Sequence, residues 1–246
     1  GWIGADAAHS LMLTPTERLW LFGDTFIGRV EDGVRQPAPF VNNTIAIEDI
    51  SDGEPGEITI YWGEDETSMF PHQPGTPGEY YWPTMALMLD GELYVFSYSI
   101  EHPNGGFFQI AGTTLHKITN PLDHPAEWEV RVGDFGIGHN DLGVHSAVYH
   151  QGDHVYLMGY KQLMGKKEMI LARISTVDLK KMRGGETVEY WVDGKDGPRW
   201  SRDPDNLVTL FTPGNTETGI QYVPEWDKYF VTTYDAEKPE IYLTWS

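Results

Sequence analysis

One strand pattern recurs four times along the chain at nearly even spacing. Each copy has large apolar residues around an aromatic second position, and these positions are Trp20, Tyr94, Tyr156 and Phe230, which lie 62 to 74 residues apart. Between the copies, short runs of Val, Ile, Tyr, Trp and Leu alternate with clusters of Gly, Pro, Asn and Asp, which is typical of antiparallel β architecture. Repeated sheets at such a period predict an all-β protein with a β-propeller fold.

The repeats predict the boundaries of the blades within one domain that spans residues 1–246. The blades are expected at about residues 1–66, 79–133, 140–195 and 206–246. Each contains four strand patterns except the last, which lacks its outermost strand. A helical turn is expected only from Thr176 to Lys181. The alternative fold is a pair of β-sandwiches, which would not give a common register between the units.

The composition excludes some partners and favours others. Lys and Arg number 17 against 37 Asp and Glu, so the net charge is −20, which argues against nucleic acid and anionic membrane surfaces as partners. There is no cysteine, hence no disulfide, and no apolar run approaches the length of a membrane span. No signal peptide opens the sequence, although a mature secreted protein would have lost it. The aromatic content of 13%, with nine Trp, suits sugar binding.

Asp24 is the residue that most clearly departs from the repeat. It ends the first copy, Arg18 to Phe26, and strand alternation puts it on the face of Trp20 and Phe22, so we expect the carboxylate at the end of a buried aromatic row. Burying a charge there costs several kcal/mol unless it is paired. The other repeats carry a phenol at this position: Tyr98, Tyr160 and Tyr234.

The first hairpin brings a second acid next to Asp24. Folding it about Thr14 to Glu17 puts Asp6 opposite about Thr25 and Asp24 opposite about Ala7. Two close carboxylates split their proton affinities, which supplies an acid and a base at one pH. The alternative is that both residues cap turns or bind a structural cation.

Other polar and aromatic residues lie at the corresponding ends of the later repeats. Glu217 begins the inner strand of the fourth repeat, beside Asp235, and is the third candidate catalytic carboxylate; a loop glutamate is the alternative. The candidate substrate-binding residues are Trp82, His9, His145, Asp141, Tyr98 and Tyr160. For these, core packing or an ordinary loop position is the alternative. No residue is assigned as a metal ligand.

Two segments resemble a known family. Gly4 to Ser10 followed by Leu19 to Phe26 is similar to the opening of a group of bacterial propellers with an uncharacterised domain, related to the endo-D-arabinanases. More distantly, the layout resembles the five-bladed glycosidases: arabinanases, arabinofuranosidases and fructosidases. The resemblance implies a polysaccharide-cleaving pocket with carboxylates from different blades. Asp6 and Asp24 match the motif, Glu217 matches only by blade position, and the chain is shorter than five such blades require.

The sequence therefore predicts a glycoside hydrolase that acts on a bacterial or plant polysaccharide, with an arabinan-like furanoside as the expected substrate. One carboxylate would activate water or attack the anomeric carbon while another protonates the leaving oxygen. We expect no cofactor, apart from a structural cation such as calcium, and an extracellular or periplasmic location; the oligomeric state is left open. The alternatives are a carbohydrate-binding propeller without catalysis and a structural or protein-interaction propeller.

Overall fold

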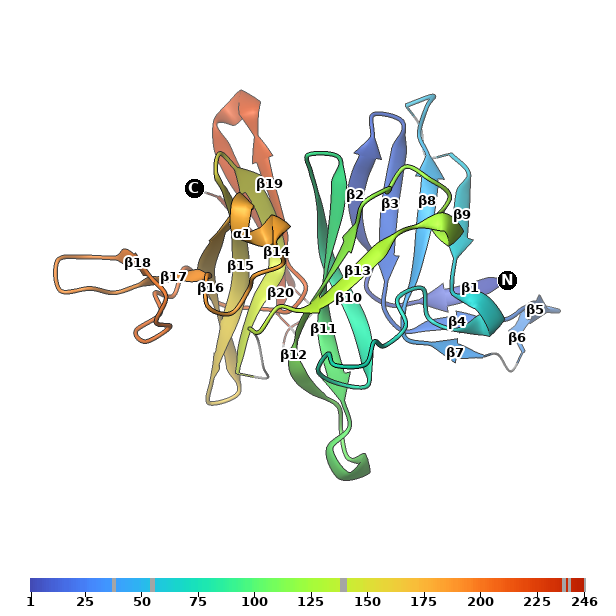
Figure 1. Ribbon diagram of the computed structural model, residues 1–246, viewed down its shortest axis with the longest axis horizontal. Coiled ribbons are helices and arrows are strands. Elements are labelled where there is room, and N and C mark those ends of the chain that lie inside the picture. The colour runs from blue at the N-terminus through green and yellow to red at the C-terminus, as the bar shows by residue number, and fades with distance from the viewer. Residues whose placement is uncertain (37–38, 54–55, 138–140, 236–237, 239, 246) are drawn as a thin grey trace. The chain divides into compact units, whose positions relative to one another are not determined.

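The computed structural model describes residues 1–36, 39–53, 56–137, 141–235, 238 and 240–245. Strands dominate this part of the chain (Figure 1), which confirms the all-β prediction. Its single α-helix, α1 (Thr176–Lys180), is the predicted helical turn. The Ser175 hydroxyl caps α1 by accepting a hydrogen bond from the amide of Asp178, as helix N-termini require. The chain divides into two compact units, residues 1–134 and 135–246, and each is described by itself.

The first unit holds two four-stranded antiparallel meanders, which correspond to the first two predicted repeats. The first contains β2 (His9–Thr14), β3 (Glu17–Phe22), β8 (Thr44–Asp49) and β9 (Ile58–Tyr61). The second contains β10 (Tyr80–Leu89), β11 (Glu92–Glu101), β12 (Gln109–Ile118) and β13 (Val130–Asp134).

Smaller elements complete the first unit, and the sequence analysis did not predict their pairing. They are the three-stranded sheet β1 (Trp2–Ala5), β4 (Thr25–Ile27) and β7 (Phe40–Val41), and the hairpin β5 (Val30–Glu31) and β6 (Val34–Arg35). Three 3₁₀ turns lie at Glu64–Glu66, Pro103–Gly105 and Pro125–Glu127.

The second unit holds the third and fourth predicted repeats, with a 3₁₀ turn at Pro224–Trp226. One sheet contains β14 (Leu142–Gln151), β15 (His154–Leu163), β16 (Lys166–Ser175), β17 (Glu189–Val192) and β18 (Arg199–Ser201). The other contains β19 (Gly219–Val223), β20 (Lys228–Asp235) and β21 (Glu240–Trp245). Over the described residues the sheet of the fourth repeat has three strands, and the sheet of the third repeat has a fifth strand, β18, that was not predicted.

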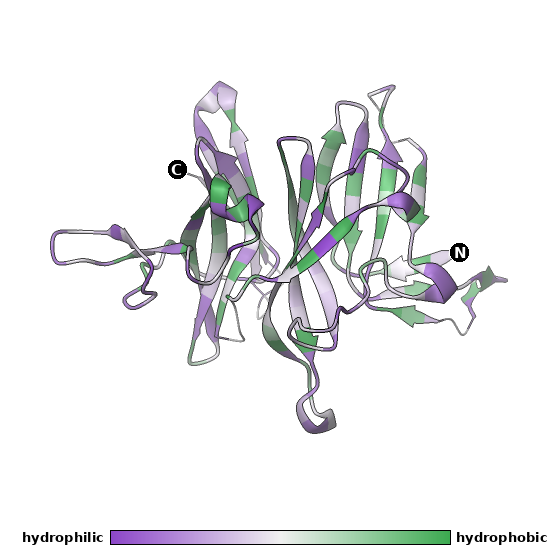
Figure 2. Cartoon of the chain, in the orientation of Figure 1, coloured by the Kyte–Doolittle hydropathy of each residue, from purple (hydrophilic) through white to green (hydrophobic). Residues whose placement is uncertain are grey.

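Hydrophobic side chains fill the space between neighbouring sheets. Leu19, Leu21 and Ile45 from the first sheet pack in one cluster with Tyr81 and Val95 from the second. Hydrophobic residues lie along β2, β3 and β8 (Figure 2), and along β3 the buried residues alternate with partly buried ones, as expected for a strand with one buried face. β2 packs against β10, and in the second unit β14 packs against β19. Within each unit, the first strands of the two meanders are therefore neighbours.

The expected buried aromatic row ending in Asp24 is wrong. The buried side of β3 is the aliphatic one, where Leu19 and Leu21 are 0% and 2% exposed, whereas Trp20 and Phe22 are only partly buried. β3 also ends at Phe22, and Gly23 and Asp24 form a bend that leads into another sheet. Leu19 and Leu21 pack in one cluster with residues of the neighbouring sheet, so the side of β3 that carries Trp20 and Phe22 faces away from that cluster.

His116 makes the stability of the fold sensitive to acid. Its ring is fully buried between Phe70 and Tyr81, and among the described residues neither ring nitrogen has a hydrogen-bond partner. Burial lowers the pKa of His116 from 6.5 to about 3. Between these values the unfolded chain binds the extra proton, so this residue lowers the free energy of unfolding as the pH falls.

We therefore expect His116→Phe to flatten the dependence of stability on pH between about 6 and 4. The slope should decrease by up to about 1.4 kcal/mol per pH unit, because one group then no longer differs in protonation between the two states. Urea denaturation at a series of pH values measures this slope. An unchanged slope in a folded variant would show that His116 takes up a proton in the native state as readily as in the unfolded one.

Candidate active site

Asp6 and Asp24 lie opposite each other where the first meander meets the small β1 sheet. The Asp6 amide donates to the Asp24 carbonyl oxygen at 3.1 Å, and the Gly23 amide donates to the Asp6 carbonyl oxygen at 3.1 Å. The hairpin of β2 and β3 contains a register shift between Met12 and Thr14. This bulge absorbs one residue and moves the predicted pairing by one step, so Asp6 faces Asp24 rather than Thr25.

Gly23 permits the close approach of the Asp6 carboxyl group. A Cβ atom at this position would lie 2.5 Å from Asp6 Oδ1, closer than a carbon and an oxygen can come without displacement. Gly23 itself is buried, while Asp24 is partly exposed and Asp6 exposed. Gly23 therefore leaves room for the carboxyl group of Asp6 next to that of Asp24.

The Asp24 carboxylate is held by one side chain from β10 and one from the bend between β7 and β8. Its Oδ1 atom accepts a hydrogen bond from Trp82 Nε1 at 2.8 Å and a longer one from Asn42 Nδ2 at 3.4 Å. Trp82 lies on β10, so the predicted proximity of this tryptophan to the acids is found in the structure. Tyr80 lies two residues before it, and burial, with the negative charge of Asp24 as the next cause, raises the pKa of Tyr80 to about 12.

The other predicted residues of the first unit are more enclosed. His9 is partly buried in β2, opposite Leu21, and burial lowers the pKa of its ring to about 4, so the ring is neutral near pH 7. Tyr98 is 4% exposed within β11. Such burial is what the core-packing alternative requires, and the substrate-binding role of both residues stays a prediction.

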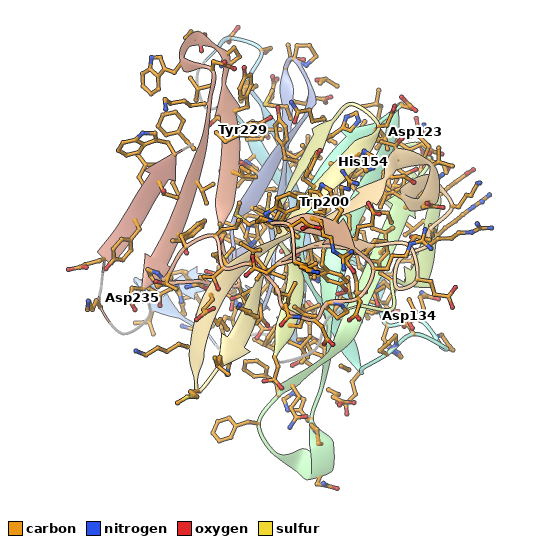
Figure 3. The ribbon with its side chains drawn as sticks, turned by 90° about the vertical axis from the view of Figure 1, so that its left-hand side faces the viewer. Asp123, Asp134, His154, Trp200, Tyr229 and Asp235 are labelled. Carbon is orange, nitrogen blue, oxygen red and sulfur yellow. The ribbon has the colours of Figure 1, made fainter. Side chains whose placement is uncertain are left out.

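Glu217 lies in the second unit, on the loop that leads into β19. Its side chain is exposed, and its amide donates to Asn215 Oδ1 at 3.2 Å. The loop is tied to β20 because Asn215 Nδ2 donates to the carbonyl oxygen of Tyr234 at 3.0 Å. Asp235, the predicted neighbour of Glu217, ends β20, and Figure 3 shows it at the opposite end of that strand from Tyr229.

A cavity of about 750 Å³ adjoins Glu217 and Asp235. Lys167 also lines it, and the Nζ atom of Lys167 lies 4.8 Å from the centre of the Tyr160 ring. Burial lowers the pKa of Lys167, while the charge of Glu217 opposes that shift. The cavity therefore combines carboxylates with an ammonium group and suits a polar ligand.

Of the remaining predicted residues of the second unit, two are buried and one is exposed. His145 and Tyr160 are 0% and 1% exposed, and burial lowers the pKa of His145 to about 3. Asp141 is exposed, and its carbonyl oxygen accepts from the amide of Gln162. These surroundings fit the packing and loop alternatives, and the binding roles stay predictions.

The described residues contain no group of three or more His, Cys, Asp or Glu side chains placed to hold a metal ion. Over the same residues, no helix has both the length and the apolar character needed to cross a membrane.

Sequence reasoning missed several residues around Asp24. Asn42, Tyr80, His102 and Phe108 are not among the site residues predicted from the sequence. Phe107 and Phe108 lie in the hairpin loop before β12, which begins at Gln109. The Gly105-Gly106 pair before them is the signal that could have placed the loop there.

Comparison with known proteins gives fold relatives and a family. No curated protein sequence matches the chain. Its fold is similar to that of a candidate hydrolase from Bacteroides ovatus, with a TM-score of 0.71 and 17% identity over 100% of this chain and 67% of the other. It is also similar to an α-L-arabinanase of Cellvibrio cellulosa, solved in complex with arabinohexaose, with a TM-score of 0.52 and 12% identity over 97% and 71% of the two chains. Residues 1–246 match the family described as "Domain of unknown function (DUF5005)", and the chain belongs to this family.

Proposed function

We propose that the protein is a glycoside hydrolase that cleaves a polysaccharide, with an arabinan-like furanoside as the expected substrate. The observation that carries the proposal is the Asp24 carboxylate, which accepts a hydrogen bond from Trp82 and lies opposite Asp6. Glycosidases need two carboxyl groups with different tasks, and an aromatic plane beside them suits a sugar ring. The fold similarity to an arabinanase supports this choice of reaction.

The surroundings of the two acids favour different tasks for them. The Asp24 carboxyl group is fixed by the hydrogen bonds that its Oδ1 atom accepts from Trp82 and Asn42. It is thus oriented to activate water or to attack the anomeric carbon. Asp6 would then protonate the leaving oxygen, while Glu217, which lies in the second unit, stays the third candidate catalytic carboxylate. Glu217 is the weaker assignment, because its support is its position on the loop just before β19 and its place in a polar cavity.

The remaining expectations belong to the same proposal. We propose that the four large sheets are blades of a propeller of the five-bladed type, in one domain over residues 1–246. The protein would act outside the cell or in the periplasm, where polysaccharides occur, without a cofactor other than a structural cation such as calcium. Its partner would be a carbohydrate and not a nucleic acid.

A carbohydrate-binding propeller without catalysis is the second candidate. The observation that favours it is the set of aromatic rings next to Asp24, where Tyr80 and Phe108 lie 5.7 and 4.8 Å from the ring of Trp82. Such rings can hold a sugar without any acid. In this case Asp24 would serve to fix the indole of Trp82.

Saccharide release from a panel of polysaccharides separates the two candidates. The purified protein is incubated with D-arabinan, L-arabinan and fructan, and the new reducing ends are measured. We expect release from one of the arabinans that depends on Asp24. Binding to one of these polymers without any release would instead support the non-catalytic candidate.

A further inference from the structure

The hairpin loop between β11 and β12 extends the surroundings of Asp24 with further aromatic side chains. The loop protrudes beyond the end of its sheet (Figure 1) and carries Phe107 and Phe108 just before β12 begins. The ring of Phe108 meets the ring of Trp82 edge to face, with centroids 4.8 Å apart at 74°. Because Trp82 donates to Asp24, the aromatic surface continues from the carboxylate onto the loop.

A hydrogen-bonded chain holds this loop in place. His102 Nδ1 lies 3.1 Å from the Gly106 carbonyl oxygen, and His102 Nε2 lies 3.0 Å from the Tyr80 hydroxyl oxygen. A carbonyl oxygen only accepts, so Nδ1 carries the proton, and in the neutral ring Nε2 then accepts from the Tyr80 hydroxyl. The loop is therefore fixed to β10 through Tyr80 as well as through the contact of Phe108 with Trp82.

Phe107 is the most exposed large hydrophobic residue on the loop between β11 and β12. Its side chain is 95% exposed, and that of Phe108 is 50% exposed. Exposed apolar side chains that stand singly are common on protein surfaces, but here the ring of Phe108 contacts the half-buried Trp82 and Phe107 is the preceding residue of the same loop. Flat rings with polar groups beside them, here the Tyr80 hydroxyl and His102, are suited to stacking and hydrogen bonding with a sugar ring.

We propose that Phe107 and Phe108, together with Trp82, form a subsite for a sugar unit of a polysaccharide chain that lies next to the unit at Asp24. The inference deepens the proposed function and relies on it for the identity of the ligand. It adds that the ligand is a polymer, because a monosaccharide at Asp24 would not need a second aromatic surface on a projecting loop.

The test is native gel electrophoresis in gels that contain D-arabinan, L-arabinan or fructan, run alongside gels without polymer. We expect the wild-type protein to be retarded by an arabinan, and Phe107→Ala and Phe108→Ala each to raise the dissociation constant about tenfold, since each removes a large apolar contact. Leu122→Ala is the matched control. Leu122 is 65% exposed and belongs to the same unit, but it lies on the loop after β12, at the other end of the sheet.

Equal retardation of the wild-type protein and both phenylalanine variants would overturn the subsite, and so would a lack of retardation in all three polymers. A different result would contradict the proposed function without contradicting the subsite. Retardation that depends on Phe107, without release of reducing ends, would retain the subsite and remove the hydrolase. Phe107 makes few contacts within the protein, so its substitution should leave the melting temperature unchanged and reduced binding cannot be assigned to unfolding.

Discussion

Asp24→Asn should leave the fold nearly unchanged and lower turnover of the polysaccharide by roughly 10²- to 10⁴-fold, the usual contribution of a positioned acid or base. The substitution keeps the shape of the side chain. Its oxygen can still accept the hydrogen bonds from Trp82 Nε1 and Asn42 Nδ2, so little stability is lost. Only the negative charge disappears. The release of reducing ends and the melting temperature are measured on the same preparation.

Two further variants make this test specific. Asp6→Asn should behave like Asp24→Asn, because the backbone hydrogen bonds place the two residues opposite each other. Asp52→Asn, on an exposed turn outside this site, should change neither turnover nor melting temperature. If Asp24→Asn instead lowers the melting temperature and its folded fraction keeps full specific activity, then Asp24 is a structural residue.

The pairing of Asp6 with Asp24 could be predicted because it follows from local chain geometry. A hairpin that turns at Thr14 to Glu17 fixes which residues face each other along both strands. The prediction was off by one residue because the bulge between Met12 and Thr14 has no clear sequence signal. A one-residue bulge shifts every later pair by one step, which here moved the partner of Asp6 from Thr25 to Asp24.

The strand order within each meander could also be predicted, since turns and apolar alternation determine it. Which side of a strand is buried could not be predicted from the strand itself. Whether Leu21 or Phe22 points inward depends on the neighbouring sheet, which lies far along the sequence. The same limit applies to Tyr98 and Tyr160, whose burial depends on packing between sheets and not on their own strands. A repeat alignment treats these tyrosines as equivalents of Asp24, although Asp24 lies in a bend beyond its strand.

Asn43 is the clearest structural residue that sequence reasoning passed over. Its side chain is fully buried, and its partners are backbone groups of segments that lie 27 and 38 residues away. Asn43 Nδ2 donates to the carbonyl oxygens of Phe70 and Tyr81 at 3.1 and 3.0 Å, and its Oδ1 accepts from the amide of Phe70 at 2.7 Å. One amide thus joins the start of β8 to the loop before β10 and to β10 itself.

Asn43→Ala should be among the most destabilising substitutions in the first unit. It would leave two buried carbonyl oxygens and one amide without partners, at about 1–3 kcal/mol for each unsatisfied group, so we expect the free energy of unfolding to fall by roughly 3–5 kcal/mol. Asn43→Asp should be similarly harmful even though it preserves the shape, because its carboxylate would face the two carbonyl oxygens that now accept from Nδ2. Urea denaturation followed by tryptophan fluorescence measures both effects.

Asn42 provides the matched control, since it is the same residue type one position earlier. Its side-chain contact with Asp24 is long, at 3.4 Å, and only partly buried, so Asn42→Ala should lower the free energy of unfolding by about 1 kcal/mol or less. A loss for Asn43→Ala no larger than that for Asn42→Ala would show that water or a shifted loop satisfies the backbone groups of Phe70 and Tyr81. In that case the connection between the first two meanders depends on the apolar packing around Leu21 and Tyr81, and Leu21→Ala would be the more destabilising change.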